Sequence, residues 1–304
     1  MNPLQVGQKI SAKRKALDLT QNELAEKLLV TYQAVSSWER GHTMPDITKL
    51  PDISQVLEIS IDELLSDKKA SDLVKNVLSG TPTTDIEPIT IAAVAPIIKP
   101  SQMPNVGQIR TPQTDQQHQQ IVSVAPLLES VQLKSLLLKM EDIPHFTITE
   151  VAPHMESIDL KDVLLTFKEV PPFTFEAVVP HMEGPDLKEV LLKMDDVPHF
   201  TFEVVAPHME SIDLKDVLIK LNDIPPFTFK VVAPHMDSED LAAVMMKLDN
   251  IPPFTIKEVI PHMDSEDLAK VLKAQTKITP DVLAQAAKHL DSEDLTQLLL
   301  KSTQ

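Results

Sequence analysis

Apolar and polar positions repeat with a period of 27 residues over most of this chain. A Pro-His-Met tripeptide at 153–155 returns at 180, 207, 234 and 261. After each tripeptide, apolar residues follow at the spacing of an amphipathic helix, as in Leu160, Val163 and Leu164. The second half of every unit is therefore predicted to be a helix.

A small residue opens each of these helices. It is serine in most copies and glycine in one, and an aspartate always follows two positions later. Serine and glycine are good N-caps, and an acidic side chain in the first turn suits the positive end of the helix dipole. We therefore expect the caps to be Ser157, Gly184, Ser211, Ser238, Ser265 and Ser292.

The first half of each unit allows two interpretations. Alternating residues such as Phe200–Val205 are typical of a strand, which would give a repeat of the leucine-rich type. One copy instead has Thr279 before Pro280, which is the pattern of a helix cap followed by a helix start. We favour a helix that begins at about Pro172, is kinked at Pro180 and ends at His181.

The array consists of six full copies from Val124 and a truncated seventh from Ala286. Helix pairs this short cannot bury their apolar faces alone, so the copies are expected to stack into an α-solenoid over residues 121–304. The array resembles HEAT or armadillo repeats in kind, although their period is longer. Residues 68–120 are rich in Pro, Gln, Ser and Thr, and we interpret them as a flexible linker. A decayed copy of the repeat is recognisable there, near 86–100.

The N-terminal segment, residues 1–67, has helical patterns of another kind. Thr20 with Glu23 three positions on is the capping-box pattern, and apolar residues follow it at helical spacing. After a short break a second helix is predicted, in which Val35 and Trp38 suit contact with a helix that crosses it steeply. This arrangement is typical of a helix-turn-helix.

From Val6 to Leu65 the sequence resembles the lambda-repressor-like, Cro/XRE-type family of helix-turn-helix domains. The resemblance implies a bundle of five helices whose third helix enters the major groove of double-stranded DNA. It also implies that Gln21 contacts a phosphate, that Gln33 pairs with adenine and that Tyr32 contacts a thymine methyl group or a phosphate. The residues expected at the DNA are Gln21, Thr31, Tyr32, Gln33, Ser36, Ser37, Arg40, His42 and Thr43.

Three basic residues of the first helix, Lys13, Arg14 and Lys15, are expected to add phosphate contacts. Two residues depart from the family pattern. Leu29 stands at the turn where the family usually has glycine, so it must adopt a left-handed conformation or alter the turn. Pro51 falls inside the expected fourth helix, where it is expected to remove a hydrogen bond and kink the chain.

Charge is distributed unevenly along the chain. Residues 1–70 hold 9 Lys and Arg against 10 Asp and Glu, a net charge of −1, and the other residues hold 19 against 35, a net charge of −16. Nucleic acid is therefore expected at the N-terminal segment, because the acidic array repels it. The array is expected to dock a basic protein or peptide instead.

One histidine recurs in each copy, at His154, His181, His208, His235, His262 and His289. Packed helices lie about 9–10 Å apart, which is too far for neighbouring imidazoles to share one metal ion. We therefore interpret each histidine as packing or capping the end of its first helix. Metal binding or a response to pH is the alternative.

The sequence lacks the patterns of most catalytic sites. It has no Cys, and it has no nucleophile elbow, phosphate-binding loop, zinc-protease motif or dinucleotide-binding Gly cluster. We expect no catalysis, no cofactor and no metal. No apolar run approaches the roughly 20 residues of a membrane span, so we expect a cytoplasmic protein that joins the nucleoid when it binds DNA.

These patterns together predict an all-α protein that acts as a sequence-specific DNA-binding transcriptional regulator, with repression as the favoured direction of control. A homodimer is expected from the family resemblance. The solenoid would then serve oligomerisation or the docking of a protein partner. The alternative is a non-catalytic interaction or immunity-type scaffold, in which the solenoid is the active part and the helix-turn-helix bundle only assembles it.

Overall fold

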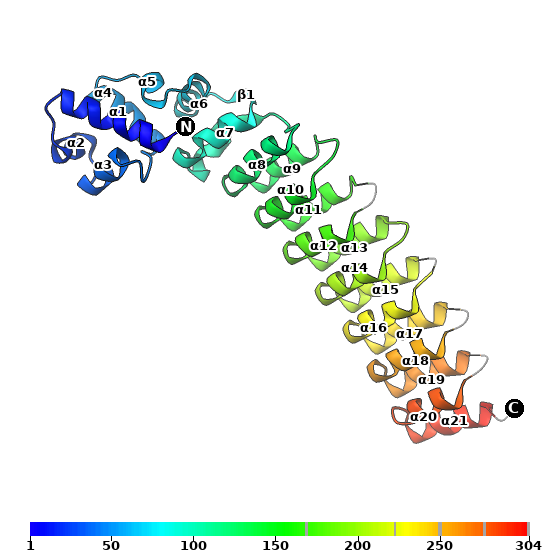
Figure 1. Ribbon diagram of the computed structural model, residues 1–304. Coiled ribbons are helices and arrows are strands. Elements are labelled where there is room, and N and C mark those ends of the chain that lie inside the picture. The colour runs from blue at the N-terminus through cyan, green and yellow to red at the C-terminus, as the bar shows by residue number, and fades with distance from the viewer. Residues whose placement is uncertain (168–169, 222, 249–250, 276–277, 303–304) are drawn as a thin grey trace. The chain divides into compact units, whose positions relative to one another are not determined.

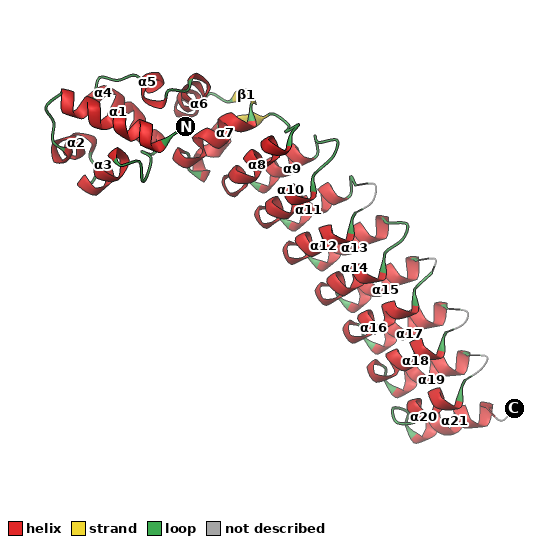
Figure 2. Ribbon diagram, in the orientation of Figure 1, coloured by secondary structure: helices red, strands yellow, loops and turns green. Residues whose placement is uncertain are grey.

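The computed structural model describes residues 1–167, 170–221, 223–248, 251–275 and 278–302 (Figure 1). In this part of the chain nearly all regular structure is helical, and two short strands form one small sheet (Figure 2). The predicted all-α class is confirmed. The chain divides into two compact units, Met1–His154 and Met155–Gln304.

The N-terminal bundle has the five helices that the family resemblance implied. They are α1 (Pro3–Ala16), α2 (Gln21–Leu28), α3 (Tyr32–Glu39), α4 (Leu50–Val56) and α5 (Ile61–Leu65). A 3-10 turn, η1 (Ile47–Lys49), leads into α4. The apolar faces of the helices meet in a core where Ile10, Leu24, Val35 and Leu64 are fully buried.

Helix α1 packs closely against the end of α3 because Gly7 has no side chain. A Cβ atom at Gly7 would lie 2.0 Å from the carbonyl oxygen of Trp38. Gly41 then turns the chain after α3 with a φ of 71°, and a Cβ atom there would lie 2.6 Å from Cα of Leu4. These two glycines fix the position of α3 on α1.

The two departures from the family pattern have different outcomes. Leu29 adopts the left-handed conformation, with φ 53° and ψ 47°, and its side chain is 87% exposed, so the turn between α2 and α3 keeps its path at a conformational cost. The expectation that Pro51 removes a hydrogen bond from the interior of the fourth helix is wrong. Pro51 stands in the first turn of α4, where its missing N–H would have no helical partner in any case.

The prediction of a flexible linker over 68–120 is also wrong, because most of this segment is folded. It contains α6 (Lys68–Ser79), β1 (Thr83–Ile86), α7 (Pro88–Val94), η2 (Ala95–Ile97), η3 (Pro100–Asn105), β2 (Gly107–Ile109) and most of α8 (Asp115–Val124). Helix α6 buries Ala70, Leu73, Val74 and Val77 on one face, which is the helical period that the polar composition concealed. It packs on both α5 and α7, so the bundle continues without a break into this segment.

The segment interpreted as a decayed repeat has the shape of a repeat's first half. Helix α7 is followed at once by the 3-10 turn η2, and the first helices of most later copies are followed by a turn of the same kind. Strand β1 precedes this segment in the sequence and strand β2 follows it. The two strands pair in parallel, with Thr83 opposite Gly107 and Ile86 opposite Ile109.

The array consists of paired short helices, as predicted, and the strand interpretation of the first half is wrong for the described residues. The first helices are α8, α10 (His145–Val151), α12 (Pro172–Val178), α14 (His199–Val205), α16 (Pro226–Val232), α18 (Pro253–Val259) and α20 (Pro280–Ala286). All but α20 end in a 3-10 turn: η4 (Ala125–Leu127), η5 (Ala152–His154), η6 (Val179–His181), η7 (Ala206–His208), η8 (Ala233–His235) and η9 (Ile260–His262). The second helices are α9 (Ser130–Leu137), α11 (Ser157–Leu164), α13 (Gly184–Lys193), α15 (Ser211–Lys220), α17 (Ser238–Lys247), α19 (Ser265–Ala274) and α21 (Ser292–Ser302).

Neighbouring copies stack helix on like helix. In the second unit α12, α14, α16, α18 and α20 pack in series, and α11, α13, α15, α17, α19 and α21 do the same. Helices α12, α14 and α16 each carry two phenylalanines and bury the second of them, so that Phe175, Phe202 and Phe229 are fully buried. A single helix pair of this length could not bury these side chains without the neighbouring copies.

The serines that we expected to cap the second helices join neighbouring copies instead. The cap position belongs to the residue before each serine, such as Glu156 or Asp237. The hydroxyl of Ser157 donates to Asp186 of the next copy, at 2.5 Å, and accepts the backbone N–H of Glu183, at 2.8 Å. The same pair of bonds starts from Ser211, Ser238 and Ser265.

This ladder is interrupted at Gly184, and restoring the serine is expected to stabilise the array. In Gly184→Ser the new hydroxyl would accept the N–H of Glu210 and donate to Asp213, as its counterparts do, which raises the free energy of unfolding by about 1 kcal/mol. A Cβ atom at 184 would lie 3.1 Å from the carbonyl oxygen of His208, a tight contact that a small shift of the neighbour relieves.

Chemical denaturation of the parent and of Gly184→Ser measures this effect. Ser211→Ala is the matched control, because it removes an existing pair of bonds and should lower stability by a similar amount or more. A Gly184→Ser protein less stable than the parent would show that the contact with His208 outweighs the new hydrogen bonds.

Candidate nucleic-acid interface

The helix-turn-helix is held at both helix starts by side-chain caps. The hydroxyl oxygen of Thr20 accepts the N–H of Glu23 at 3.2 Å, and the carboxylate of Glu23 accepts the N–H of Thr20 at 2.7 Å. This is the capping box that the sequence predicted. The backbone N–H and the hydroxyl group of Thr20 both donate to the Glu23 carboxylate and lower its pKa. Thr31 caps α3 in the same way, accepting the N–H of Ala34 at 3.2 Å. The start of α3 is therefore fixed by Thr31 itself.

Helix α3 presents one face to the core and the opposite face to solvent. Val35 and Trp38 are buried against the bundle, and α3 packs on both α1 and α2. Tyr32 is 47% exposed and Gln33 is exposed. The remaining residues expected on this face, Ser36 and Ser37, are half-buried. The exposed face of α3 thus carries the polar and aromatic residues that the sequence placed there.

The loop after α3 brings three further predicted residues beside the helix. The hydroxyl oxygens of Ser37 and Thr43 lie 2.8 Å apart and share a hydrogen bond. Arg40 and His42 are exposed in the same loop. The structure therefore gathers eight of the nine predicted residues on α3, its cap and this loop.

The ninth residue, Gln21, is engaged inside the protein. Its amide group donates to the carboxylate of Glu39 at 2.7 Å. Glu39 in turn binds Arg14, with Nε 2.5 Å from Oε1 and Nη2 3.0 Å from Oε2, and Nη1 of Arg14 donates to the carbonyl of Leu19 at 2.5 Å. Gln21 thus ties the start of α2 to the end of α3. A phosphate contact by this residue stays a prediction.

The expectation that Arg14 contacts phosphate is wrong. Only 8% of Arg14 is exposed, and its guanidinium group donates to both carboxylate oxygens of Glu39 and to the Leu19 carbonyl. Burial alone would raise the pKa of Glu39, but the hydrogen bonds from Arg14 and Gln21 outweigh it and lower that pKa. The group is therefore a structural ion pair that locks α1, α2 and α3 together.

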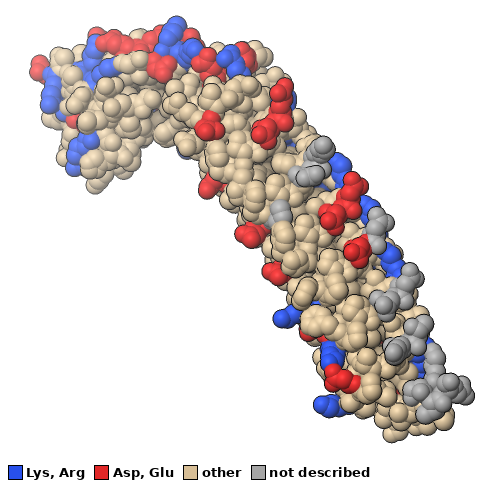
Figure 3. Space-filling model, turned by 45° about the vertical axis from the view of Figure 1, so that its right-hand side comes forward, with Lys and Arg blue, Asp and Glu red and all other residues tan. Residues whose placement is uncertain are grey.

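The other basic residues of α1 take no part in the ion pair between Arg14 and Glu39. Lys9 donates to the carbonyl of Glu63 and to the hydroxyl of Ser66, and Lys13 pairs with the Glu63 carboxylate at 3.5 Å. Lys15 is exposed. Acidic and basic side chains are interspersed on the face of this bundle seen in Figure 3. A field of a single sign does not cover that face.

Sequence reasoning missed the contribution of Glu39. The side chain of this residue is only 6% exposed, yet its carboxylate joins Gln21 of α2 and Arg14 of α1 to the end of α3. No local pattern marks it, because Arg14 lies 25 residues away and the pair forms only when α1 and α3 pack.

The histidine row forms no metal site in the described part of the chain. There, no group of three or more His, Asp or Glu residues is placed to hold an ion. Most of the repeated histidines are exposed, and His181 is half-buried. Among the same residues, no helix has the length and apolar character of a membrane span.

The geometry of α2 and α3 agrees with the family that this part of the sequence matches. Residues 10–64 match the model of the Helix-turn-helix family. These residues are a helix-turn-helix domain. The domain covers α2, α3 and the turn at Leu29 in full, together with most of the helices that support them.

Several curated proteins are similar to part of the chain. The HTH-type transcriptional activator BcrR of Enterococcus faecalis is 40% identical over 63 residues, which are 21% of this chain and 31% of that protein. The uncharacterized HTH-type transcriptional regulator YqaE of Bacillus subtilis is 38% identical over 74 residues, 23% and 64% of the two chains. Repressor protein C2 of Salmonella phage P22 is 38% identical over 65 residues, 21% and 30%. The chain spans less than two thirds of the length of each of these relatives.

Among solved structures, the apo form of the competence regulator ComR from Streptococcus vestibularis aligns over 100% of this chain and 98% of its own. The sequence identity is 13% and the TM-score is 0.21. So low a score supports no conclusion about a shared architecture or ligand.

Proposed function

We propose that the protein is a sequence-specific DNA-binding transcriptional regulator that inserts α3 into the major groove. The observation that carries the proposal is the exposed face of α3, on which Tyr32 and Gln33 lie opposite the buried Val35 and Trp38. A helix held in this way by its N-cap and by two crossing helices is the element that reads base edges in helix-turn-helix domains. The match of residues 10–64 and the relatives named as transcriptional regulators support it.

Each exposed residue has a role that its chemistry allows. Gln33 offers an amide that pairs with both N6 and N7 of adenine, and Tyr32 offers a ring for a thymine methyl group. Thr31, Ser36 and Ser37 offer hydroxyl groups to base edges or phosphates. The residues proposed to contact the DNA backbone are Gln21, Arg40, His42 and Thr43.

A homodimer completes the proposal. The first 70 residues have a net charge of only −1, so one bundle supplies few phosphate contacts, and two bundles on a palindrome double them. The half-sites are then about 34–36 Å apart, one turn of B-DNA. Repression is the direction of control that we propose, because a dimer bound over a promoter excludes other proteins without further contacts.

The array is proposed to serve assembly or partner docking and to take no part in catalysis. Residues 155–304 hold 14 Lys and Arg against 27 Asp and Glu, a net charge of −13, so a basic protein or peptide suits this surface. Its stacked copies offer an extended face of the kind that solenoid proteins use for binding.

Selection of DNA by the full chain from a random duplex pool tests the proposal. The parent is expected to enrich a palindrome, and Tyr32→Ala with Gln33→Ala is expected to lose at least about tenfold in affinity for it, because a bidentate contact to one base contributes about 1–3 kcal/mol. Gln55→Ala, an exposed substitution on α4, is the matched control and should bind as the parent does.

Circular dichroism of each variant separates loss of contact from loss of folding. A folded parent that enriches no sequence would contradict the proposal. The helix-turn-helix bundle would then be an assembly module, and the array would be the active part.

A further inference from the structure

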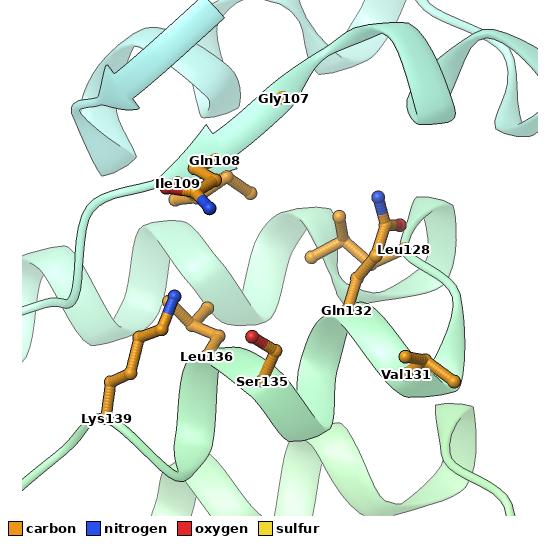
Figure 4. A pocket seen from close by; sticks show the side chains of 9 residues that line it. All are labelled: Gly107, Gln108, Ile109, Leu128, Val131, Gln132, Ser135, Leu136 and Lys139. Atoms are coloured by element: carbon orange, nitrogen blue, oxygen red, sulfur yellow. The ribbon is translucent and has the colours of Figure 1, made fainter. Parts of the chain in front are cut away.

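The first unit contains a groove between strand β2 and helix α9 that the proposed DNA interface does not use (Figure 4). It has a volume of about 270 Å³. One wall is the whole of β2, and the other wall is one face of α9 with Leu128 before it and Lys139 after it. Figure 4 shows the side chains of the two walls on either side of the open space.

Strand β2 has one paired edge and one free edge. The N–H of Thr83 donates to the carbonyl of Val106 at 3.2 Å, and the N–H of Arg110 donates to the carbonyl of Ile86 at 2.7 Å. In a parallel pair of this register the backbone groups of Val106, Gln108 and Arg110 face β1. The N–H and C=O groups of Gly107 and Ile109 therefore point away from β1.

Those four backbone groups have no hydrogen-bond partner within the part of the chain that the structure describes. Gly107 has no side chain to cover them, and substitution is blocked because a Cβ atom would lie 2.0 Å from the carbonyl oxygen of Thr83. An open strand edge beside a groove is a template for an added strand, whose main-chain groups complete the ladder.

The helical wall offers apolar contacts with polar groups between them. Val131 is 63% exposed, and Leu128 and Leu136 line the groove beside it. The carbonyl oxygen of the Gln132 side chain accepts the N–H of Glu129 at 3.0 Å, so its amide hydrogens remain for a ligand. Ser135 adds an exposed hydroxyl group.

The charge of the groove selects its occupant. None of the nine lining residues is acidic, and Lys139 is the cation among them. Lys139 is exposed, and Figure 4 places it near the end of β2 at Ile109. Arg110, the next residue, is neutralised by Asp85 at 2.5 Å and Glu87 at 3.5 Å.

We propose that this groove binds a short extended peptide of another protein, which adds to the free edge of β2 and places an Asp or Glu side chain at Lys139. Strand residues advance by about 3.3 Å, so the edge from Gly107 to Ile109 takes three or four peptide residues. Their alternate side chains lie against Val131 and Leu136, which favours an apolar residue in the peptide. The site does not depend on the DNA interface, so either proposal can fail without the other.

Selection of random heptapeptides displayed on phage by the immobilised full chain tests the proposal. We expect enriched peptides with alternating apolar residues and an acidic residue at one fixed position. Lys139→Glu, at an exposed site, should keep the fold and bind these peptides at least about tenfold more weakly. Selection on that variant should enrich Lys or Arg at the same position.

A backbone variant tests the added strand itself. Ile109→Pro removes an N–H that faces the groove and none that faces β1, and Ile109→Val keeps it as the matched control. By fluorescence polarisation with a selected peptide, Ile109→Pro should lose about tenfold or more in affinity, and Ile109→Val should stay near the parent. The proposal is overturned if no peptide is enriched, or if the selected peptides bind Lys139→Glu and Ile109→Pro as they bind the parent.

Discussion

Replacement of Glu39 by alanine is expected to destabilise the helix-turn-helix bundle by about 3–5 kcal/mol, because it leaves the charge of Arg14 buried without a partner. The side chains of Arg14 and Glu39 are 10% and 6% exposed, and arginine does not lose its proton to escape the cost. A typical domain has only about 5–15 kcal/mol of stability in total. DNA binding should be lost with the fold, although Glu39 does not lie on the exposed face of α3 that is proposed to enter the major groove.

Chemical denaturation followed by the fluorescence of Trp38, the single tryptophan, measures this loss inside the bundle. Glu26→Ala, an exposed change on α2, is the matched control and should stay within about 0.5 kcal/mol of the parent. Arg14→Met combined with Glu39→Leu should recover most of the stability, since an apolar pair has no unpaired charge. Equal stability of Glu39→Ala and Glu26→Ala would show that the ion pair does not hold the bundle.

Acid titration gives a second measure of the same ion pair. The pKa of Glu39 is lowered in the folded protein, so its contribution is present above the ordinary glutamate pKa of about 4.3. That contribution is lost as the pH falls through the lowered pKa of the folded state. The acid limb of the stability curve should therefore be shallower in the Arg14→Met, Glu39→Leu double variant.

The features that the sequence predicted correctly are local ones. Thr20 and Glu23 stand three residues apart, and their capping box forms within a single turn. Pro172 starts a helix because proline suits the first helical position, and the following 3-10 turn ends at His181 as expected. The 27-residue period can be recognised in the sequence without knowledge of the packing, so the pairing of helices in each copy could also be predicted.

The features that the sequence did not reveal depend on distant partners. Ser157 has the position and residue type of an N-cap, yet its hydroxyl group is used by Asp186, 29 residues later. Arg14 has the composition of a phosphate contact, yet packing of α1 on α3 delivers it to Glu39. In both cases the local pattern is compatible with two roles, and only the stacking of helices decides between them.

Composition was misleading over 68–120 for a related reason. Pro and Thr in this segment begin helices, as Pro88 does for α7 and Thr114 does as the cap of α8. The polar residues lie on exposed faces, and the few apolar ones are concentrated on the buried faces, such as Ala70 and Leu73 of α6. Counting residue types removes that phase information, which is the part that specifies the fold.

The two phenylalanines of α14 are expected to differ sharply in their effect on stability, although they stand two residues apart. Phe202 is fully buried, and Phe200 is 44% exposed. Phe202→Ala should cost about 3–5 kcal/mol, because it leaves a cavity between stacked copies. Phe200→Ala should change the free energy of unfolding by about 0.5 kcal/mol at most, since its ring stays largely in water.

Hydrogen exchange resolved along the chain measures where the stability is lost. Each copy contacts only its neighbours, so Phe202→Ala should lower protection most in α12, α14 and α16 and least in the helix-turn-helix bundle. Phe200→Ala supplies the matched control in the same helix. If both changes lowered protection equally, Phe200 would be covered in solution, and the exposed phenylalanines at 173, 200, 227 and 254 would then mark a surface where another chain packs on the array.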